Sequence, residues 1–426
     1  LWATTMLLVV PLLALLFAGM YVAVALGVVS FIGFYLMLGG NMPVLIGDTT
    51  FNLTNNFVLS AVPLFIFMGS LILHTGFSSG LYKGVSVFSR YVPGNLLHSD
   101  IIACTIFSAC SGSSVATAAA IGTVALPEME SQGYERKITA GSLAAGGTLG
   151  PIIPPSLGFI IYGAITETSV GQLFFAGAIP GLILSAMFMS YIVVRVVLDP
   201  SLVPSKKESA MPFVEKVKTV LQAWPIFGIM LTVLGGIYLG WTTPTEAAGC
   251  GAMGALLLSL AYKKLTLSKL QDALVKTLEI TALIMVLVAA SNFFGAVFAR
   301  LGTPTLLTDF LLGLEMNKYL ILAIVMSMIF LLGWPLEWVP IVMIIIPIIL
   351  PLIEALGFNL TWFAILVAVN LQTAWLSPPV ALSAYFLKGV VPEWDLKDIY
   401  LGMMQFMVLK VIGLIIIIIF PTIALW

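Results

Sequence analysis

Residues 146–156 read GGTLGPIIPPS, and residues 370–379 read NLQTAWLSPP. Each stretch places two adjacent prolines inside an apolar segment that is long enough to cross a bilayer. Proline lacks a backbone donor and clashes with the carbonyl one turn before it, so we expect a helix to unwind at each stretch. The sequence therefore predicts two broken transmembrane helices, at 138–167 and 359–388.

Two further apolar blocks, 98–127 and 318–353, are interrupted in their middles. The interruptions are Ser111-Gly112-Ser113-Ser114 in the first block and Gly333-Trp334-Pro335 in the second. A chain that turns within hydrocarbon must bury its freed backbone groups against protein. We therefore predict two re-entrant helical hairpins whose tips end inside the membrane.

The composition places the rest of the chain in the same environment. Of 426 residues, 60% are hydrophobic and only 9% are charged, whereas soluble domains have roughly a quarter charged residues. The net charge of -1 and the absence of a basic patch indicate no nucleic-acid partner. Three cysteines and two histidines show no metal-ligand spacing. The remaining spans are expected near 4–18, 20–38, 55–75, 172–198, 224–241, 244–262, 278–300 and 402–424.

The two halves of the chain repeat one another. Four residues of the first half have identical counterparts at a constant offset of 224, and two glycines recur at an offset of 226. The matched positions are Pro127 with Pro351, Gly133 with Gly357, Pro154 with Pro378, Pro155 with Pro379, Gly69 with Gly295 and Gly76 with Gly302. We predict an internal duplication, with repeats at 1–198 and 224–426 and a linker with a surface helix at 199–223.

Charge indicates how the repeats are oriented. Five crossings and one hairpin per repeat give an odd number of crossings, which turns the second repeat upside down. With the linker in the cytoplasm, most lysines and arginines also fall inside, as the positive-inside rule requires. Lys263–Lys276 is expected to form an amphipathic helix along the interface. The predicted fold class is an all-α polytopic membrane protein with two inverted repeats, the pattern of secondary transporters.

The four breaks predict a site for a cation and an anion. Freed carbonyls and the serine hydroxyls of the first tip provide oxygen ligands, and the N-termini of returning half-helices offer N–H groups to an anion. The alternative is that the small residues only allow close helix packing. The expected substrate-binding residues are Ser113, Ser114, Thr117, Pro154, Pro155, Glu337, Ser377 and Pro378.

Two acidic residues, Glu337 and Glu246, have different expected roles. Glu337 follows the second tip, where a carboxylate could bind a cation or cap a half-helix. Glu246 stands two residues after Pro244, and we expect it only to complement a helix dipole. No glycine is followed directly by lysine, so a P-loop for a nucleotide is excluded and an ion gradient is the expected source of energy.

The sequence resembles the large membrane subunit of tripartite ATP-independent periplasmic (TRAP) transporters. The resemblance covers essentially the whole chain and rests on seven stretches together. They are Ser111-Gly-Ser-Ser-Val-Ala-Thr117, Ala118-Ala-Ala-Ile-Gly122, Gly147-Thr-Leu-Gly150 with Ile153-Pro-Pro-Ser156, Ala176-Gly-Ala-Ile-Pro-Gly181, Thr243-Pro-Thr-Glu-Ala-Ala248, Gly333 with Glu337, and Ser377-Pro-Pro-Val380.

The resemblance implies a transporter subunit, not an enzyme, in the bacterial inner membrane. It implies an elevator, in which hairpins and broken helices form a transport domain that slides against a scaffold. Sodium is the implied co-transported ion. The implied partners are a small four-helix membrane subunit and a periplasmic substrate-binding protein that delivers a carboxylate. The implied sodium ligands are Ser111, Gly112, Ser113, Thr148 and Gly150, with Gly333, Pro335, Gln372 and Thr373 in the other half.

Two other readings of the residues stay open at the level of sequence. A stand-alone anion symporter or exchanger of the same superfamily would need no binding protein. A passive channel would need a continuous polar path, and polar residues within the predicted spans are scarce.

Overall fold

The computed structural model describes residues 2–38, 44, 46–48, 50–51, 55–204, 212–334, 336, 338–378 and 381–426, and every regular element there is a helix. The first part contains α1 (Trp2–Phe17), α2 (Val22–Leu38), η2 (Phe57–Ser60), α4 (Ala61–His74), α5 (Phe77–Ser89), α6 (Leu96–Ser111), α7 (Ser114–Gln132), α8 (Arg136–Gly147), α9 (Leu157–Thr166), α10 (Val170–Leu198) and η3 (Pro200–Leu202). The second contains α11 (Phe213–Leu221), α12 (Trp224–Tyr238), α13 (Pro244–Ala261), α14 (Leu267–Arg300), α15 (Thr303–Leu312), α16 (Lys318–Leu332), α17 (Trp338–Ala355), α18 (Leu360–Leu376), α19 (Leu382–Val390), α20 (Leu396–Ile419) and η4 (Pro421–Ile423).

The predicted interruptions are present. Only two residues separate α6 from α7, and residues 333–337 separate α16 from α17. The broken helices are α8 with α9, parted by residues 148–156, and α18 with α19, parted by residues 377–381. The all-α fold with hairpins and broken helices that the sequence predicts is thus confirmed.

The same order of elements occurs twice. The run from α4 to α10 and the run from α14 to α20 each contain a helix, a short helix, a hairpin, a broken helix and a long closing helix. Gly76 precedes α5 with a φ of 70°, and its counterpart Gly302 precedes α15 with a φ of 67°. Both take the left-handed conformation that glycine adopts without steric cost. The opposite insertion of the two runs in a membrane stays a prediction.

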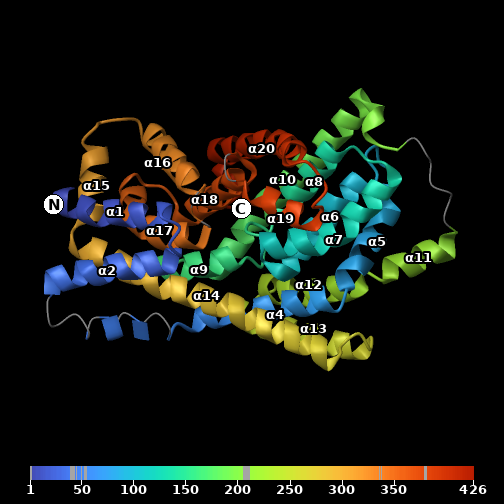
Figure 1. Cartoon of the computed structure of the whole chain (residues 1–426), viewed down its shortest axis with the longest axis horizontal. Helices are drawn as coiled ribbons and strands as arrows, with labels where there is room; N and C mark the ends of the chain where they lie inside the picture. Colours follow the sequence, from blue (N-terminus) through green and yellow to red (C-terminus); the bar gives the residue numbers. More distant parts are fainter. Residues whose placement is uncertain are drawn as a thin grey trace.

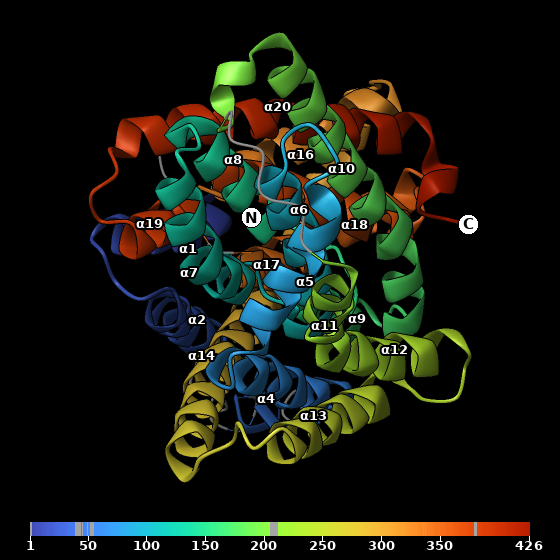
Figure 2. The same ribbon diagram turned by 90° about the vertical axis from the view of Figure 1, so that its right-hand side faces the viewer.

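The helices are arranged in layers across the molecule. In Figure 1, α4, α13 and α14 lie along one long edge, and α20 lies along the opposite edge. Figure 2 keeps this arrangement after a quarter turn, with the hairpins and broken helices between the two edges. In the first break, residues 148–156 are all buried.

The surface suits a bilayer. Five described segments are long and apolar enough to cross a membrane alone, and α11 with α12, bent by 46° at their junction, would make a sixth. Many large apolar side chains on the outer helices are exposed, such as Phe17, Tyr35 and Leu198. Lipid is the solvent in which such a surface is stable.

The predicted interfacial helix at Lys263–Lys276 is wrong as a separate element. Instead, α14 begins at Leu267 and continues to Arg300, a run of 34 residues. No glycine or proline occurs from Leu267 to Phe294, so nothing in the sequence ends the helix. At 1.5 Å per residue it is about 50 Å long. That length exceeds the bilayer core of about 30 Å.

The described part of the linker contains the 3-10 helix η3 and one α-helix, α11, which has no buried residue. Its Lys216 Nζ donates a hydrogen bond to the Tyr91 hydroxyl over 2.6 Å, which ties α11 to the loop after α5. Residues 205–211 of the linker lie outside the described residues. The cytoplasmic position of this segment stays a prediction.

Candidate transport site

The first hairpin tip is pressed against the first helix break. Gly112 ends α6 with a φ of 59°, and its N–H donates to the Ser108 carbonyl over 2.9 Å. A Cβ atom added to Gly112 would lie 2.7 Å from the Pro155 carbonyl oxygen. A Cβ added to Gly150 would lie 3.0 Å from the Ser113 carbonyl oxygen. Backbone therefore touches backbone at this point, which only glycine permits.

Three oxygen atoms lie close together at the first tip: the Ser111 and Thr117 hydroxyls and the Ser113 carbonyl. The Ser111 and Thr117 hydroxyls are 2.8 Å apart, and the Thr117 hydroxyl also donates to the Ser113 carbonyl over 2.8 Å. The Ser113 hydroxyl caps α7 by accepting from the Ala116 N–H over 3.4 Å. The predicted sodium ligands Ser111, Gly112, Ser113 and Gly150 are thus brought together, and their chemistry fits a hard cation.

Prolines keep the first break non-helical, and a serine caps the helix that follows it. After α8 ends at Gly147, no helix forms until Ser156 caps α9 by accepting from the Phe159 N–H over 3.4 Å. The same serine hydroxyl donates to the Pro151 carbonyl over 2.7 Å. The predicted residues Pro154 and Pro155 lie in this segment and are buried.

The second tip contacts the second break in a similar way. A Cβ atom added to Gly333 would lie 2.8 Å from the Ala374 Cβ. The Trp334 indole N–H donates to the Ser377 hydroxyl over 2.8 Å, and this hydroxyl donates to the Ala374 carbonyl over 2.8 Å. The predicted residues Pro335 and Glu337 lie outside the described residues.

The last turns of α18 carry the other predicted ligands. The Thr373 hydroxyl donates to the Val369 carbonyl over 2.9 Å, within the helix. Pro378 lies two residues after the end of α18 and is half-buried. Gln372 is buried, and its side-chain carbonyl accepts a hydrogen bond from a partner on α20.

That partner is Lys410, which the sequence reasoning missed. Lys410 lies within α20 and is fully buried. Its ammonium group donates to the Thr148 hydroxyl and, over 2.8 Å, to the Gln372 side-chain carbonyl. Thr148 and Gln372 are predicted sodium ligands from opposite halves of the chain. One lysine therefore joins the two halves at the centre of the candidate site.

A second buried ionisable residue, Asp100, was also missed. Its carboxylate accepts a hydrogen bond from the Ser142 hydroxyl over 2.9 Å, which connects α6 to α8. Among the described residues its other oxygen has no hydrogen-bond partner. An acidic residue within a predicted hairpin arm was the available signal.

Trp375 lines two apolar cavities. One is lined by residues of the first break, α9, α17 and α18, including Pro151, Trp338 and Gln372. The other is lined by Ser114, Gly147, Ser383 and neighbouring residues. In the described part of the chain, the Gln372 Nε2 and Trp375 Nε1 atoms are buried donors without a partner. Unpaired donors beside a cavity suit a ligand that carries acceptors.

The predicted substrate residues are not all placed at these cavities. Ser114 lines the second cavity. Neither cavity is lined by Ser113, Thr117, Pro154, Pro155, Ser377 or Pro378. The hydroxyls of Thr117 and Ser377 instead bond within their own half.

Glu246 has the structural role expected of it. Its carboxylate accepts from the Thr243 N–H over 2.8 Å, and its own N–H donates to the Thr243 hydroxyl over 3.3 Å. This reciprocal pair is a capping box at the start of α13.

The chain is similar to known proteins over nearly its whole length. A family model described as "Tripartite ATP-independent periplasmic transporter, DctM component" matches residues 9–423. The chain is 29% identical to the sialic acid TRAP transporter large permease protein SiaM of Vibrio cholerae, covering 97% of this chain and 96% of that protein. It is 30% identical to the C4-dicarboxylate TRAP transporter large permease protein DctM of Pseudomonas aeruginosa, covering 88% and 87% of the two chains.

Two further proteins match the chain: a permease named for another substrate, and a transporter of known structure. The ectoine TRAP transporter large permease protein TeaC of Halomonas elongata is 29% identical over 99% of this chain and 98% of its own length. Among solved structures, the YdaH transporter of Alcanivorax borkumensis superimposes with a TM-score of 0.51 at 15% identity, covering 92% of this chain and 90% of that one. This last likeness concerns the fold alone.

Proposed function

This chain belongs to the DctM family, the large membrane components of TRAP transporters, and we propose from that premise that it couples sodium entry to uptake of a small organic anion bearing a carboxylate. The chain is a multi-pass protein of the bacterial inner membrane and a transport component, not an enzyme. The family works with a periplasmic substrate-binding protein and usually a small membrane subunit. In our proposal a binding protein delivers the anion to this chain.

The oxygen cluster at the first tip supports sodium coupling. The Ser113 carbonyl and the Ser111 and Thr117 hydroxyls lie beside the unwound helix segment 148–156. Unwound carbonyls within a membrane transporter are the usual ligands of a co-transported alkali cation. This cluster is the observation that carries the proposal.

The unpaired donors beside Trp375 support an anionic substrate. A carboxylate offers two acceptor oxygens, and Gln372 Nε2 and Trp375 Nε1 are donors that lack an acceptor in the described part of the chain. Two of the relatives named above are named for sialic acid and for C4-dicarboxylates, and both classes contain a carboxylate. In the proposed mechanism, the hairpins and broken helices move together as an elevator, because each tip is in contact with its break.

The test is uptake into proteoliposomes that contain the assembled complex, with the binding protein added outside. The probes are a labelled C4-dicarboxylate and a labelled sialic acid, each with an inward sodium gradient or with choline in place of sodium. We expect uptake of one class that needs both sodium and the binding protein. Uptake without the binding protein would favour the stand-alone symporter, and uptake that is equal in choline would refute sodium coupling.

A pair of serine variants locates the ion. Ser111→Ala removes one hydroxyl from the cluster, and we expect the sodium concentration for half-maximal uptake to rise about 10-fold, equivalent to about 1.4 kcal/mol. Ser131→Ala is the matched control, because Ser131 is exposed on the same hairpin and bonds only to the Glu128 carbonyl. An unchanged sodium dependence in Ser111→Ala would remove this residue from the ion site.

A further inference from the structure

We propose that the Lys410 ammonium group is a tethered cation that occupies the position between Thr148 and Gln372, two residues that the family resemblance implies as sodium ligands in opposite halves of the chain. The inference deepens the proposed function, on which it rests: sodium ions bind at the hairpin tips, while the centre between the two halves holds a lysine. The transporter then binds one sodium ion fewer than its set of oxygen ligands suggests.

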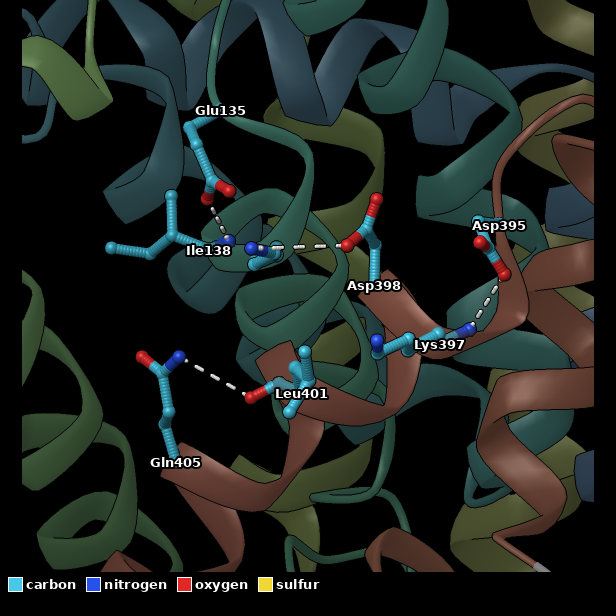
Figure 3. A network of polar contacts seen from close by, with 8 residues as sticks. Glu135, Ile138, Asp395, Lys397, Asp398, Leu401 and Gln405 are labelled. Carbon is cyan, nitrogen blue, oxygen red and sulfur yellow. Dashed lines mark hydrogen bonds and ion pairs between the residues drawn. The ribbon is translucent and has the colours of Figure 1, made fainter.

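The fold positions Lys410 through close contact between α8 and α20. A Cβ atom added to Gly402 would lie 1.9 Å from the Lys137 carbonyl oxygen, so the two backbones touch there. One turn earlier on α20, Lys137 Nζ lies 3.8 Å from the Asp398 carboxylate. Figure 3 shows Asp398 at the start of α20. About two turns beyond Gly402 on α20, Lys410 donates to Thr148, just beyond the end of α8. The contacts therefore advance in the same direction along both helices.

This parallel register brings Lys410 to the end of α8. Thr148, which caps the C-terminus of α8, is seven residues beyond Gly141, and Lys410 is eight residues beyond Gly402. Each step is about two helical turns. The lysine thus reaches the break without leaving the interface between the helices.

The surroundings of Lys410 are those of a cation site. Gln372 lies four residues before the end of α18, so the ammonium group sits at the C-terminal ends of two helices. Each such end carries partial negative charge from unpaired carbonyls. The ring of Phe188 lies 5.9 Å from Lys410 Nζ, within the range of a cation–π contact. No described carboxylate forms an ion pair with Lys410.

The ammonium group and a sodium ion compete for the same atoms. An ammonium is a donor only, so both the Thr148 hydroxyl oxygen and the Gln372 carbonyl oxygen must accept from it. Sodium would need the same lone pairs and would repel the buried charge. The lysine also fixes the Gln372 amide, leaving its NH₂ group for the cavity beside Trp375.

The test counts bound sodium, which requires no substrate. Purified complex is equilibrated with radioactive sodium, and the ions bound per complex are measured at saturation. Lys410→Met removes the charge at similar length, so we expect it to bind one more sodium ion than the wild type. Lys397→Met is the matched control, because Lys397 is exposed on the same helix, and it should bind the wild-type number. An unchanged count in Lys410→Met overturns the proposal.

Thr148→Val tests the wild-type site should Lys410→Met fail to fold. With Lys410 present, Thr148 holds no sodium, so this variant should keep the wild-type count. Loss of one ion would show that Thr148 binds sodium beside the lysine, and would overturn the proposal. In the Lys410→Met background, Thr148→Val should remove the added ion again.

The outcomes separate this inference from the proposed function. If the wild type binds no sodium, sodium coupling fails, yet a first ion acquired by Lys410→Met would still support a tethered cation. If Lys410→Met keeps the wild-type count and binds C4-dicarboxylate or sialic acid more weakly, the ammonium serves the substrate and the proposal is wrong.

Discussion

Gly141 on α8 and Gly402 on α20 are in direct backbone contact, because a Cβ atom added to Gly141 would lie 2.6 Å from the Gly402 carbonyl oxygen. This contact sets the distance between a helix of the first half and the last helix of the second. Without it, Lys410 would not reach the two breaks. The hydrogen bonds of Lys410 to Thr148 and Gln372 therefore depend on two residues that have no side-chain polar group.

Gly402→Ala is expected to push the two helices apart. The added methyl group cannot be accommodated by moving a side chain, since it meets backbone. We expect a loss of about 1–3 kcal/mol in stability, as for overpacked cores. Thermal unfolding of the purified protein in detergent measures it. Gly249→Ala is the control, because nothing lies within 4 Å of the added atom, and it should be neutral or slightly stabilising. Equal effects in both variants would argue against close packing at Gly402.

The contact between the first tip and the first break can be isolated in a similar way. Gly112→Ala introduces both a strained left-handed residue and a clash with the Pro155 carbonyl. Gly76→Ala introduces the same backbone strain, at a φ of 70°, with open space around the methyl group. The strain costs about 1 kcal/mol in each case. We expect Gly112→Ala alone to reduce uptake strongly, by at least about 10-fold, and similar uptake in both variants would mean that the tip does not need to touch the break.

The breaks and tips were predictable from the sequence because their causes are local. Pro154 and Pro155 cannot continue a helix whatever surrounds them, and Gly112 permits a turn that other residues resist. Lys410 carried a local signal as well, as the one ionisable residue in the segment 402–424, and an intramembrane charge indicates function. Its pairing with Thr148 and Gln372 carried none. Thr148 is 262 residues away in sequence, and only the packing of α8 on α20 brings them together.

The substrate residues were harder to predict for a related reason. Thr117 and Ser377 are hydroxyl residues at the breaks, as expected, but their hydroxyls bond to carbonyls of their own half. A sequence does not tell which way a serine or threonine faces when it has a carbonyl nearby. Trp375 and Gln372, whose donors remain unpaired, were distinguished only by the packing around them.

The second tip should be coupled energetically to the second break through Trp334 and Ser377. Their hydrogen bond of 2.8 Å is lost in both Trp334→Phe and Ser377→Ala. A double-mutant cycle on thermal stability should therefore give a coupling energy of about 0.5–1.5 kcal/mol. A cycle that pairs Trp334→Phe with Ser131→Ala should give none. Additive effects in the first cycle would show that the hydrogen bond does not hold the tip.

Trp375→Phe and Trp362→Phe are expected to have opposite effects on stability and substrate affinity. The Trp375 Nε1 atom is buried and has no described partner, whereas the Trp362 Nε1 atom donates to the Ile417 carbonyl over 3.0 Å. Trp375→Phe removes an unpaired donor and should leave the folded protein as stable as before or more so. If the substrate carboxylate accepts from this donor, its affinity should fall about 10-fold, the effect of one hydrogen bond to a charged group.

Trp362→Phe should show the reverse behaviour. It leaves the Ile417 carbonyl unpaired in a buried position, at a cost of about 1–3 kcal/mol in stability. The Trp362 side chain does not line the cavity formed by Trp375 and Gln372, so substrate affinity should not change. Thermal unfolding and equilibrium binding of a labelled C4-dicarboxylate or sialic acid measure both quantities on the same samples. Because the two substitutions are chemically identical, a loss of affinity in Trp375→Phe alone would assign the indole N–H to the substrate. Unchanged affinity in Trp375→Phe would place the anion elsewhere, and the cavity beside this residue would then have only a packing role.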